Sequence, residues 1–252
     1  MRPPVDTIAA PAFPRGLPWI NSAPLRMDQQ IARPVLVEFW DFCRVNSLRT
    51  LPYLREWHRR YSGAGLRVIG VHAAGFAPSN SVEAVREAVA RLEVPYPVVV
   101  DVDLEIWRLY GNRGWPARYL WNRGGTLHDY HYGEGAYAET ERAIQRLLGA
   151  EREPVRPRRP EDDPRAVLAA QTADQPGAYS GPYAAGGVWA VLDGRGRVLV
   201  NGSAVDVDHP GCYALIEHPS HRESKLELEV GEGVTCHAIC FTPGVVDHAE
   251  AA

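Results

Sequence analysis

The amino-acid sequence predicts an α/β protein in which a mixed sheet flanked by helices is followed by a small antiparallel β domain. Short apolar runs at residues 35–40, 66–72 and 98–100 alternate with segments whose apolar residues recur at helical spacing. This pattern is typical of buried strands joined by helices. The composition then changes, because residues 151–165 are dense in proline and charge, as in a semi-stiff linker. We therefore expect domains over 1–150 and 166–252, joined by a linker over 151–165.

The other elements of the first domain follow from cap and turn residues. Asn80 or Ser81 can cap a helix, Gly63 and Gly65 can end one, and the turn residues 122–125 predict a hairpin. In chain order we expect a lead-in over 8–34 that packs on the domain, a helix from Ser47 that ends before Gly63, a helix from about Val82, a short helix over 105–110, strands over 117–121 and 127–132, and a helix over 138–148.

The second domain reads as short strands separated by turns. Asn201-Gly202 is a strong hairpin signal between strands 198–200 and 204–207. We interpret Gly186-Gly187 and Asp193-Gly194-Arg195-Gly196 as turns, and no phosphate-loop pattern follows either of them. Further strands are expected over 213–216, 226–230 and 234–241.

Composition argues against several classes of partner. The formal net charge is −4 and basic residues form no stripe with interleaved aromatics, so we expect no nucleic-acid partner. No run approaches the roughly 20 apolar residues of a membrane span, and the N-terminus lacks an apolar run of signal-peptide length. We therefore expect a soluble, cytoplasmic protein without a cofactor. The four cysteines are too scattered for a disulfide framework, and the oligomeric state stays open.

Residues 39–54 resemble the active-site strand and helix of the TlpA/DipZ-type thioredoxin-like proteins. In that family the segment reads F-W-T-Y-x-C-I-N-C-x-R-T-L-P-Y-L, and here it reads F-W-D-F-C-R-V-N-S-L-R-T-L-P-Y-L. The resemblance covers residues 10–148 and continues more weakly into the β domain. It implies a thioredoxin-like mixed sheet and a redoxin relationship to the thiol-specific antioxidant (AhpC/TSA) proteins. Other matching segments are Gly70-Val71-His72, Arg113-Gly114-Trp115-Pro116-Ala117, Tyr119-Leu120 and Gly133-Glu134-Gly135.

The sequence departs from the family at both redox positions. Aligned residue by residue, the first cysteine of the family falls on Arg44 and the second on Ser47. Dithiol exchange needs an attacking thiolate at the helix start and a second sulfur about one turn further on. A guanidinium and a hydroxyl supply neither. We therefore expect no dithiol oxidoreductase activity.

Other parts of the site are retained. Trp115-Pro116 matches the family's cis-proline position, whose neighbouring backbone offers a strand edge to extended peptides. The resemblance thus implies a redox-inactive binding or scaffolding protein with a remnant groove for a peptide or protein partner. The alternative is that these residues only maintain the fold. The predicted binding residues are Trp40, Arg44, Ser47, Trp115 and Pro116.

Glu38 falls where the resemblance places a buried carboxylate behind the redox pair. Without a cysteine partner, an ionised Glu38 would carry the cost of an unpaired buried charge. Two solutions are expected. Either Glu38 pairs with Arg44, or it stays protonated and Arg44 is free to bind an anionic ligand.

Cys43 supports an alternative function, that of a single-cysteine thiol oxidoreductase or peroxidase. Arg44, Arg49 and a helix N-terminus nearby could lower its pKa. Against this, a peroxiredoxin needs Thr or Ser three residues before its cysteine, and that position holds Trp40. Cys43 is also interpretable as an inert, partly buried residue.

The second domain offers two weaker candidates. Its histidines and cysteines suggest zinc, but Cys236 and Cys240 in one strand would be about 13 Å apart, too far for one metal or a disulfide. We therefore predict no metal site. Its aromatic residues could form a sugar-stacking platform but are more often core. These aromatics are Tyr179, Tyr183, Trp189 and Tyr213.

Overall fold

The computed structural model describes residues 7–246, and the chain divides into two compact units between Arg156 and Pro157. The boundary falls inside the segment that composition marks as a linker. Each unit has a hydrophobic core of its own. We call residues up to 156 unit 1 and the rest unit 2.

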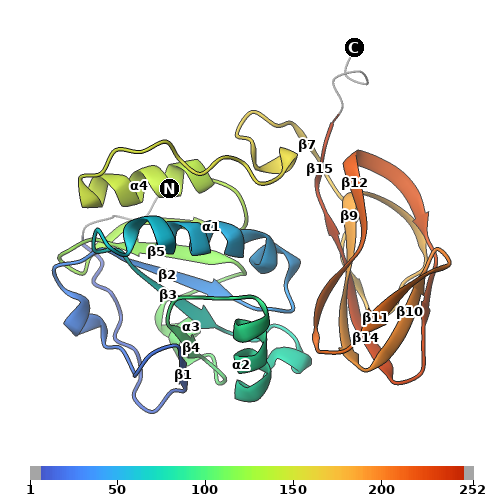
Figure 1. Cartoon of the computed structure of the whole chain (residues 1–252), viewed down its shortest axis with the longest axis horizontal. Coiled ribbons are helices and arrows are strands. Elements are labelled where there is room, and N and C mark those ends of the chain that lie inside the picture. Colours follow the sequence, from blue (N-terminus) through green and yellow to red (C-terminus); the bar gives the residue numbers. More distant parts are fainter. Residues whose placement is uncertain (1–6, 247–252) are drawn as a thin grey trace. The chain divides into compact units, whose positions relative to one another are not determined.

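Unit 1 is built on a six-stranded mixed sheet with the order β1-β4-β3-β2-β5-β6 (Figure 1). Strands β2, β3 and β4 pair in parallel, and the other neighbours pair antiparallel. The strands are β1 (Trp19–Ile20), β2 (Val35–Trp40), β3 (Arg67–His72), β4 (Val98–Val100), β5 (Ala117–Trp121) and β6 (Leu127–Tyr132). The helices are α1 (Val45–Tyr61), α2 (Val82–Arg91), α3 (Glu105–Leu109) and α4 (Tyr137–Leu148), with 3-10 turns at Met27–Gln30 and Ala77–Ser79.

These elements confirm the fold class predicted from the sequence. The side chain of Ser81 accepts a hydrogen bond of 3.1 Å from the backbone N–H of Ala84, so Ser81 caps α2. Helix α1 begins at Val45, two residues earlier than predicted, and continues through Pro52. Strand β1, which lies in the lead-in, was not predicted. It forms by pairing with β4.

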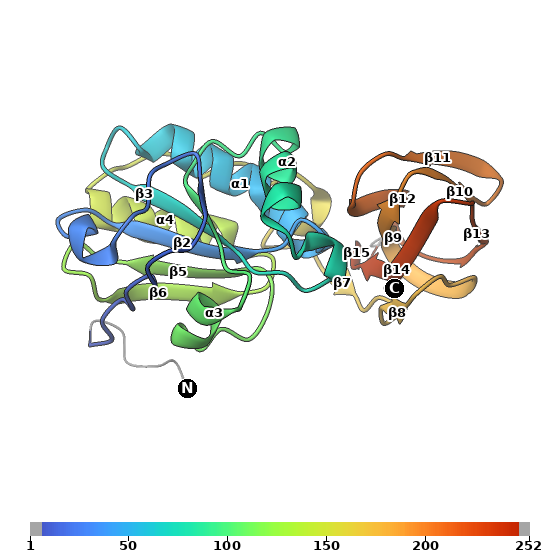
Figure 2. The same cartoon turned by 90° about the horizontal axis from the view of Figure 1, so that it is seen from below.

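The two faces of the sheet are covered differently. Val37 and Phe39 of β2 belong to a core shared with Phe13 of the lead-in and Ile106 of α3. Side chains alternate along a strand, so Glu38 faces the opposite side. Helices α1 and α4 cover that side, and α3 lies on the other side of the sheet (Figures 1 and 2).

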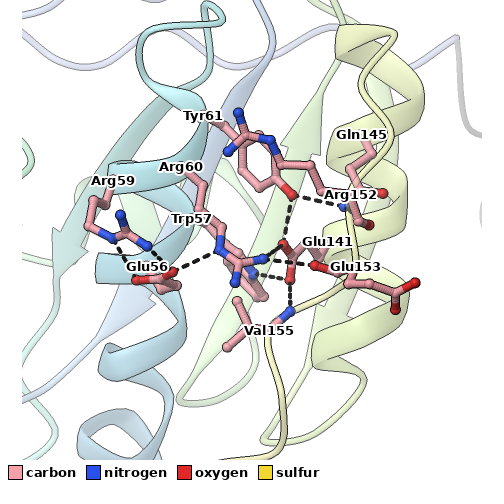
Figure 3. Close-up of polar contacts among 10 residues, drawn as sticks. All are labelled: Glu56, Trp57, Arg59, Arg60, Tyr61, Glu141, Gln145, Arg152, Glu153 and Val155. Carbon is pink, nitrogen blue, oxygen red and sulfur yellow. Dashed lines mark hydrogen bonds and ion pairs between the residues drawn. The ribbon is translucent and has the colours of Figure 1, made fainter.

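A buried carboxylate joins α1, α4 and the end of unit 1 (Figure 3). Glu141 of α4 is fully buried. It accepts hydrogen bonds from Tyr61 Oη at 2.7 Å, Trp57 Nε1 at 3.1 Å and Arg60 Nη1 at 3.0 Å. The backbone N–H of Val155 donates a fourth, at 2.6 Å. Four donors compensate for the burial of this charge, so we assign Glu141 a structural role.

Unit 2 consists of antiparallel strands in three sheets. The main sheet has the order β12-β9-β14-β8, a second has β11-β10-β13, and β15 pairs with β7. The Asn201-Gly202 hairpin is confirmed by the pairing of β10 with β11. The strands are β7 (Leu168–Ala169), β8 (Gln175–Pro176), β9 (Gly181–Gly194), β10 (Gly196–Val200), β11 (Ser203–Val207), β12 (Gly211–Leu226), β13 (Leu228–Val230), β14 (Val234–Thr242) and β15 (Gly244–Val245). A 3-10 turn spans Pro160–Asp162.

One predicted turn in unit 2 is wrong. Gly186 and Gly187 lie inside the long strand β9. A Cβ on Gly186 would come within 2.3 Å of the carbonyl oxygen of Pro243 and 2.7 Å of the Cα of Gly244. Glycine is therefore needed here because another backbone segment crosses the strand closely, and not because the chain turns.

Candidate functional site

The two positions that hold cysteine in the TlpA/DipZ-type family lie at the start of α1. Arg44 is the N-cap residue and adopts extended backbone dihedrals, with φ −109° and ψ 117°. Ser47, in the first turn, is 1% exposed, and its hydroxyl accepts a hydrogen bond of 3.2 Å from the backbone N–H of Asp41. Ser47 therefore serves to fix the loop between β2 and α1, and it is too buried to contact a ligand directly.

The Arg44 guanidinium lies between two aromatic rings. Its Cζ is 4.5 Å from the ring centroid of Phe76 and 4.6 Å from that of Trp115, distances at which cation–π attraction operates. A Cβ on Gly75 would lie 2.7 Å from Arg44 Nε, so the absence of a side chain at Gly75 makes room for the guanidinium. We call these half-exposed residues (Arg44, Gly75, Phe76 and Trp115) the Arg44 surface.

Within residues 7–246, Arg44 Nε is buried and has no hydrogen-bond partner. Buried donors are normally satisfied, so this atom is a candidate contact for a ligand acceptor. The aromatic stacking holds the guanidinium in place. The Arg44 surface can therefore present a fixed cation with at least one unused donor.

Trp115 is itself held in place. Its indole Nε1 donates a hydrogen bond of 2.7 Å to the carbonyl oxygen of Ala73, and its ring lies 4.3 Å from that of Trp107. The Trp115–Pro116 peptide bond is cis. Pro116 is buried, as is Trp40 at 0% exposure. Of the five predicted binding residues, Arg44 and Trp115 meet at the surface, whereas Trp40, Ser47 and Pro116 lie beneath it.

The expected ion pair between Glu38 and Arg44 is wrong. Glu38 is fully buried, and neither of its carboxylate oxygens has a hydrogen-bond partner among residues 7–246. The Arg44 side chain instead lies against the Cα of Gly75, where a Cβ would come within 2.7 Å of its guanidinium. Burial raises the pKa of Glu38 to about 8, although the charge of Arg118 acts in the opposite direction. The structure thus favours the second expectation, a protonated Glu38.

Arg118 is a buried cation that the sequence analysis missed. It lies directly opposite Glu38 in the pairing of β2 with β5, and is 1% exposed. Its Nη2 donates a hydrogen bond of 2.5 Å to the carbonyl oxygen of Gly135, and its guanidinium lies 5.8 Å from the Trp57 ring and 5.1 Å from the Tyr137 ring. Burial lowers its pKa, and Glu38 opposes that effect. An arginine in an otherwise apolar strand was the signal that could have found it.

Cys43 is fully buried. Its backbone N–H donates a hydrogen bond of 2.8 Å to Asp41 Oδ1, and the backbone N–H of Gly75 donates one of 2.7 Å to Asp41 Oδ2. Burial alone would raise the pKa of Asp41, but His72 and these two N–H groups lower it below its usual value. The Asp41 carboxylate therefore organises the loop around Cys43 and leaves its thiol inaccessible to a substrate.

The other predicted candidates lie in unit 2. Cys236 and Cys240 are both in β14, as predicted. No group of three or more His, Cys, Asp or Glu side chains in residues 7–246 is arranged to hold a metal ion. Tyr183 is 4% exposed and belongs to the core of unit 2, against which Tyr179 and Tyr213 pack. Tyr183 is therefore a core residue, and Tyr179 and Tyr213 are partly buried against the core instead of forming an exposed platform.

Comparison with known proteins decides what this fold is. No protein-family model matches the chain. Unit 1 is similar to the solved thiol-disulfide isomerase of Corynebacterium glutamicum, with a TM-score of 0.50 and 20% identity over 56% of this chain and 98% of that one. Unit 1 has a thioredoxin-like fold.

Two sequence relatives extend this thioredoxin-like identification. This chain is 32% identical to Protein DipZ of Mycobacterium bovis over 200 residues, which is 78% of this chain. The matched length exceeds that of unit 1. The chain spans only 28% of the length of DipZ. It is 24% identical to the thiol-disulfide oxidoreductase YkuV of Bacillus subtilis, over 52% of this chain and 87% of YkuV. Among residues 7–246, no helix is both long and apolar enough to cross a membrane.

Proposed function

We propose that this thioredoxin-like chain is a redox-inactive binding protein that holds an extended segment of a partner protein at the Arg44 surface. The observation that carries the proposal is the guanidinium stacked between Phe76 and Trp115, at the position of the family's attacking cysteine. A cation there can bond a carboxylate, whereas it cannot exchange a disulfide.

The buried Cys43 weighs against the alternative, a single-cysteine oxidoreductase or peroxidase. A thiol must be reached by its substrate to react, and Cys43 is 0% exposed. The reactive sulfur would have to become exposed through a rearrangement of the loop that Asp41 holds.

The surface favours an acidic peptide ligand. Its aromatic rings can contact the peptide's apolar side chains, and the backbone beside Pro116 belongs to the segment that offers a strand edge in this family. The guanidinium would then select a carboxylate on the same segment. The buried donor at Arg44 Nε would gain the acceptor that it lacks.

The test is a binding titration with synthetic extended peptides that carry one glutamate, followed by the NMR signal of the Trp115 indole. A charge-assisted hydrogen bond contributes about 1.5–3 kcal/mol, so Arg44→Ala should weaken binding by roughly 10- to 100-fold. Replacing the peptide glutamate with glutamine should have a similar effect. If Arg44→Ala and the peptide change weaken affinity equally, and combining them causes no further loss, then Arg44 contacts the peptide glutamate.

Arg59→Ala is the matched control. Arg59 is exposed on the same helix, about 22 Å from Arg44 along the helix axis, and its ion pair with Glu56 contributes little. It should leave peptide affinity unchanged. If Arg59→Ala weakens binding as much as Arg44→Ala does, the contact is non-specific and the proposal fails.

A further inference from the structure

A pocket of about 170 Å³ lies in unit 1 and shares no residue with the Arg44 surface. Its walls come from the lead-in, α3, β5 and β6. Four aliphatic residues, Ile8, Pro11, Leu109 and Leu127, form part of the lining. The rest of the lining is aromatic and consists of Tyr110, Tyr119, Trp121, Tyr130 and Tyr132.

The aromatic wall is preformed by edge-to-face contacts. Tyr110 meets Tyr119 at a centroid distance of 5.4 Å and 77°, and Trp121 at 5.7 Å and 85°. Tyr130 meets Tyr132 at 5.7 Å and 70°. Such packing is the preferred geometry of aromatic pairs, and it fixes each ring through its neighbours. A ligand ring entering the pocket would extend the same arrangement.

The pocket is neutral, and two of its wall residues have an unused hydrogen-bond donor. None of the lining residues carries a charge, and burial raises the pKa values of Tyr110 and Tyr119, so their hydroxyls stay protonated. Tyr119 Oη donates to Asn112 Oδ1 at 3.0 Å. By contrast, the buried Tyr110 hydroxyl and Trp121 Nε1 have no partner among residues 7–246, which is rare for buried donors.

We propose that this pocket binds a small, neutral, single-ring aromatic molecule with one hydrogen-bond acceptor. Its volume of about 170 Å³ is comparable to that of an apolar cavity of about 150 Å³ that accepts benzene. The ring packs against the aromatic wall, and the acceptor gives one of the two unused donors a partner. A charged ligand is excluded because nothing in the lining compensates for its desolvation.

Entry is possible at the rim, where Leu109, Tyr132 and Ile8 are 53%, 43% and 38% exposed. These three are the lining residues that are exposed to solvent. The site therefore needs no rearrangement of the sheet, and its occupancy is independent of peptide binding at the Arg44 surface.

The probes are phenol, toluene and benzoate, titrated against the whole chain and followed by the NMR signal of the Trp121 indole. Phenol should bind about fivefold more tightly than toluene, which corresponds to one net hydrogen bond of about 1 kcal/mol. Benzoate should not bind. Equal affinities for phenol and toluene would overturn the hydrogen-bond assignment, and saturable shifts at Trp189 of unit 2 instead of Trp121 would overturn the site.

Leu109→Trp and Ile8→Trp each place a larger side chain at the rim and should weaken phenol binding about tenfold or more, a loss of about 1.4 kcal/mol. Ile31→Trp is the control, because Ile31 is equally exposed, at 54%, but does not line the pocket. A control variant that loses phenol as strongly as the rim variants would contradict the proposal. The wild-type titration decides the question even if a rim variant fails to fold.

Discussion

Replacing Glu38 with glutamine should change how the stability of unit 1 depends on pH. The pKa of Glu38 is raised from 4.5 to about 8 in the folded protein. Between these values the folded state keeps a proton that the unfolded state has released. The stabilising contribution of Glu38 is therefore fully present below pH 4.5 and is lost as the pH rises through 8.

The size of the effect follows from the shift. One pKa unit corresponds to about 1.4 kcal/mol. The wild type should therefore lose about 3 kcal/mol of stability between pH 4.5 and pH 7 through Glu38, and about 5 kcal/mol in total above pH 8. Glu38 is fully buried, so solvent screening does not reduce this figure. The Glu38→Gln variant has no proton to release and should lack this loss.

The assay is denaturant unfolding at several pH values, followed by tryptophan fluorescence, because six of the seven tryptophans lie in unit 1. The stability difference between Glu38→Gln and wild type should shift in favour of the variant as the pH rises. Glu87→Gln, an exposed change on α2, is the control and should give a flat difference. A flat difference for Glu38→Gln would refute the reasoning, and a shift in favour of wild type would show that Glu38 is an ionised partner of Arg118.

Four further substitutions, one of them with a matched control, test other parts of the account. Arg44→Ala should cost only about 1 kcal/mol, the value of exposed cation–π contacts. Arg118→Ala should cost about 2–5 kcal/mol because it leaves a cavity at a fully buried position; chemical denaturation compares the two. Glu141→Ala should destabilise unit 1 by about 3 kcal/mol or more, because it leaves the buried donors of Trp57, Tyr61 and Val155 without an acceptor at about 1–3 kcal/mol each. The exposed Glu139→Ala on the same helix is the control and should change the unfolding midpoint little. Gly75→Ala should displace the flexible Arg44 side chain and weaken peptide affinity, while lowering stability by no more than the about 1 kcal/mol expected for Arg44→Ala. Unchanged peptide affinity would contradict the assigned position of the guanidinium.

The sequence analysis predicted most strands of unit 1 well, because β2 and β4 are buried apolar runs and because β5 and β6 flank the turn residues 122–125. Strands β2, β4, β5 and β6 have the predicted bounds. By contrast, β1 has only two residues, too few to show a periodicity. It exists because its backbone hydrogen bonds are made to β4, which is distant in the sequence. A local sequence pattern cannot predict such a pairing.

The candidate site was predicted in part. The sequence placed Arg44 and Ser47 at the start of a helix, and the structure puts both there. It could not show the direction of the Arg44 side chain, which depends on the missing side chain of Gly75, 31 residues further along. It also missed Arg118, because strand pairing brings it opposite Glu38 from a distant part of the chain. Contacts of this kind are set by the register of the sheet and not by local spacing.

The central claim, that the chain has lost dithiol chemistry, is tested most directly by an insulin-reduction assay. Wild type should show no turnover above the uncatalysed rate, because neither Arg44 nor Ser47 can take part in thiol exchange. The double variant Arg44→Cys with Ser47→Cys should show measurable turnover, since both positions lie at the start of α1. Wild-type turnover comparable to that of an ordinary thioredoxin would contradict the account, and its loss in Cys43→Ser would assign the activity to the buried thiol.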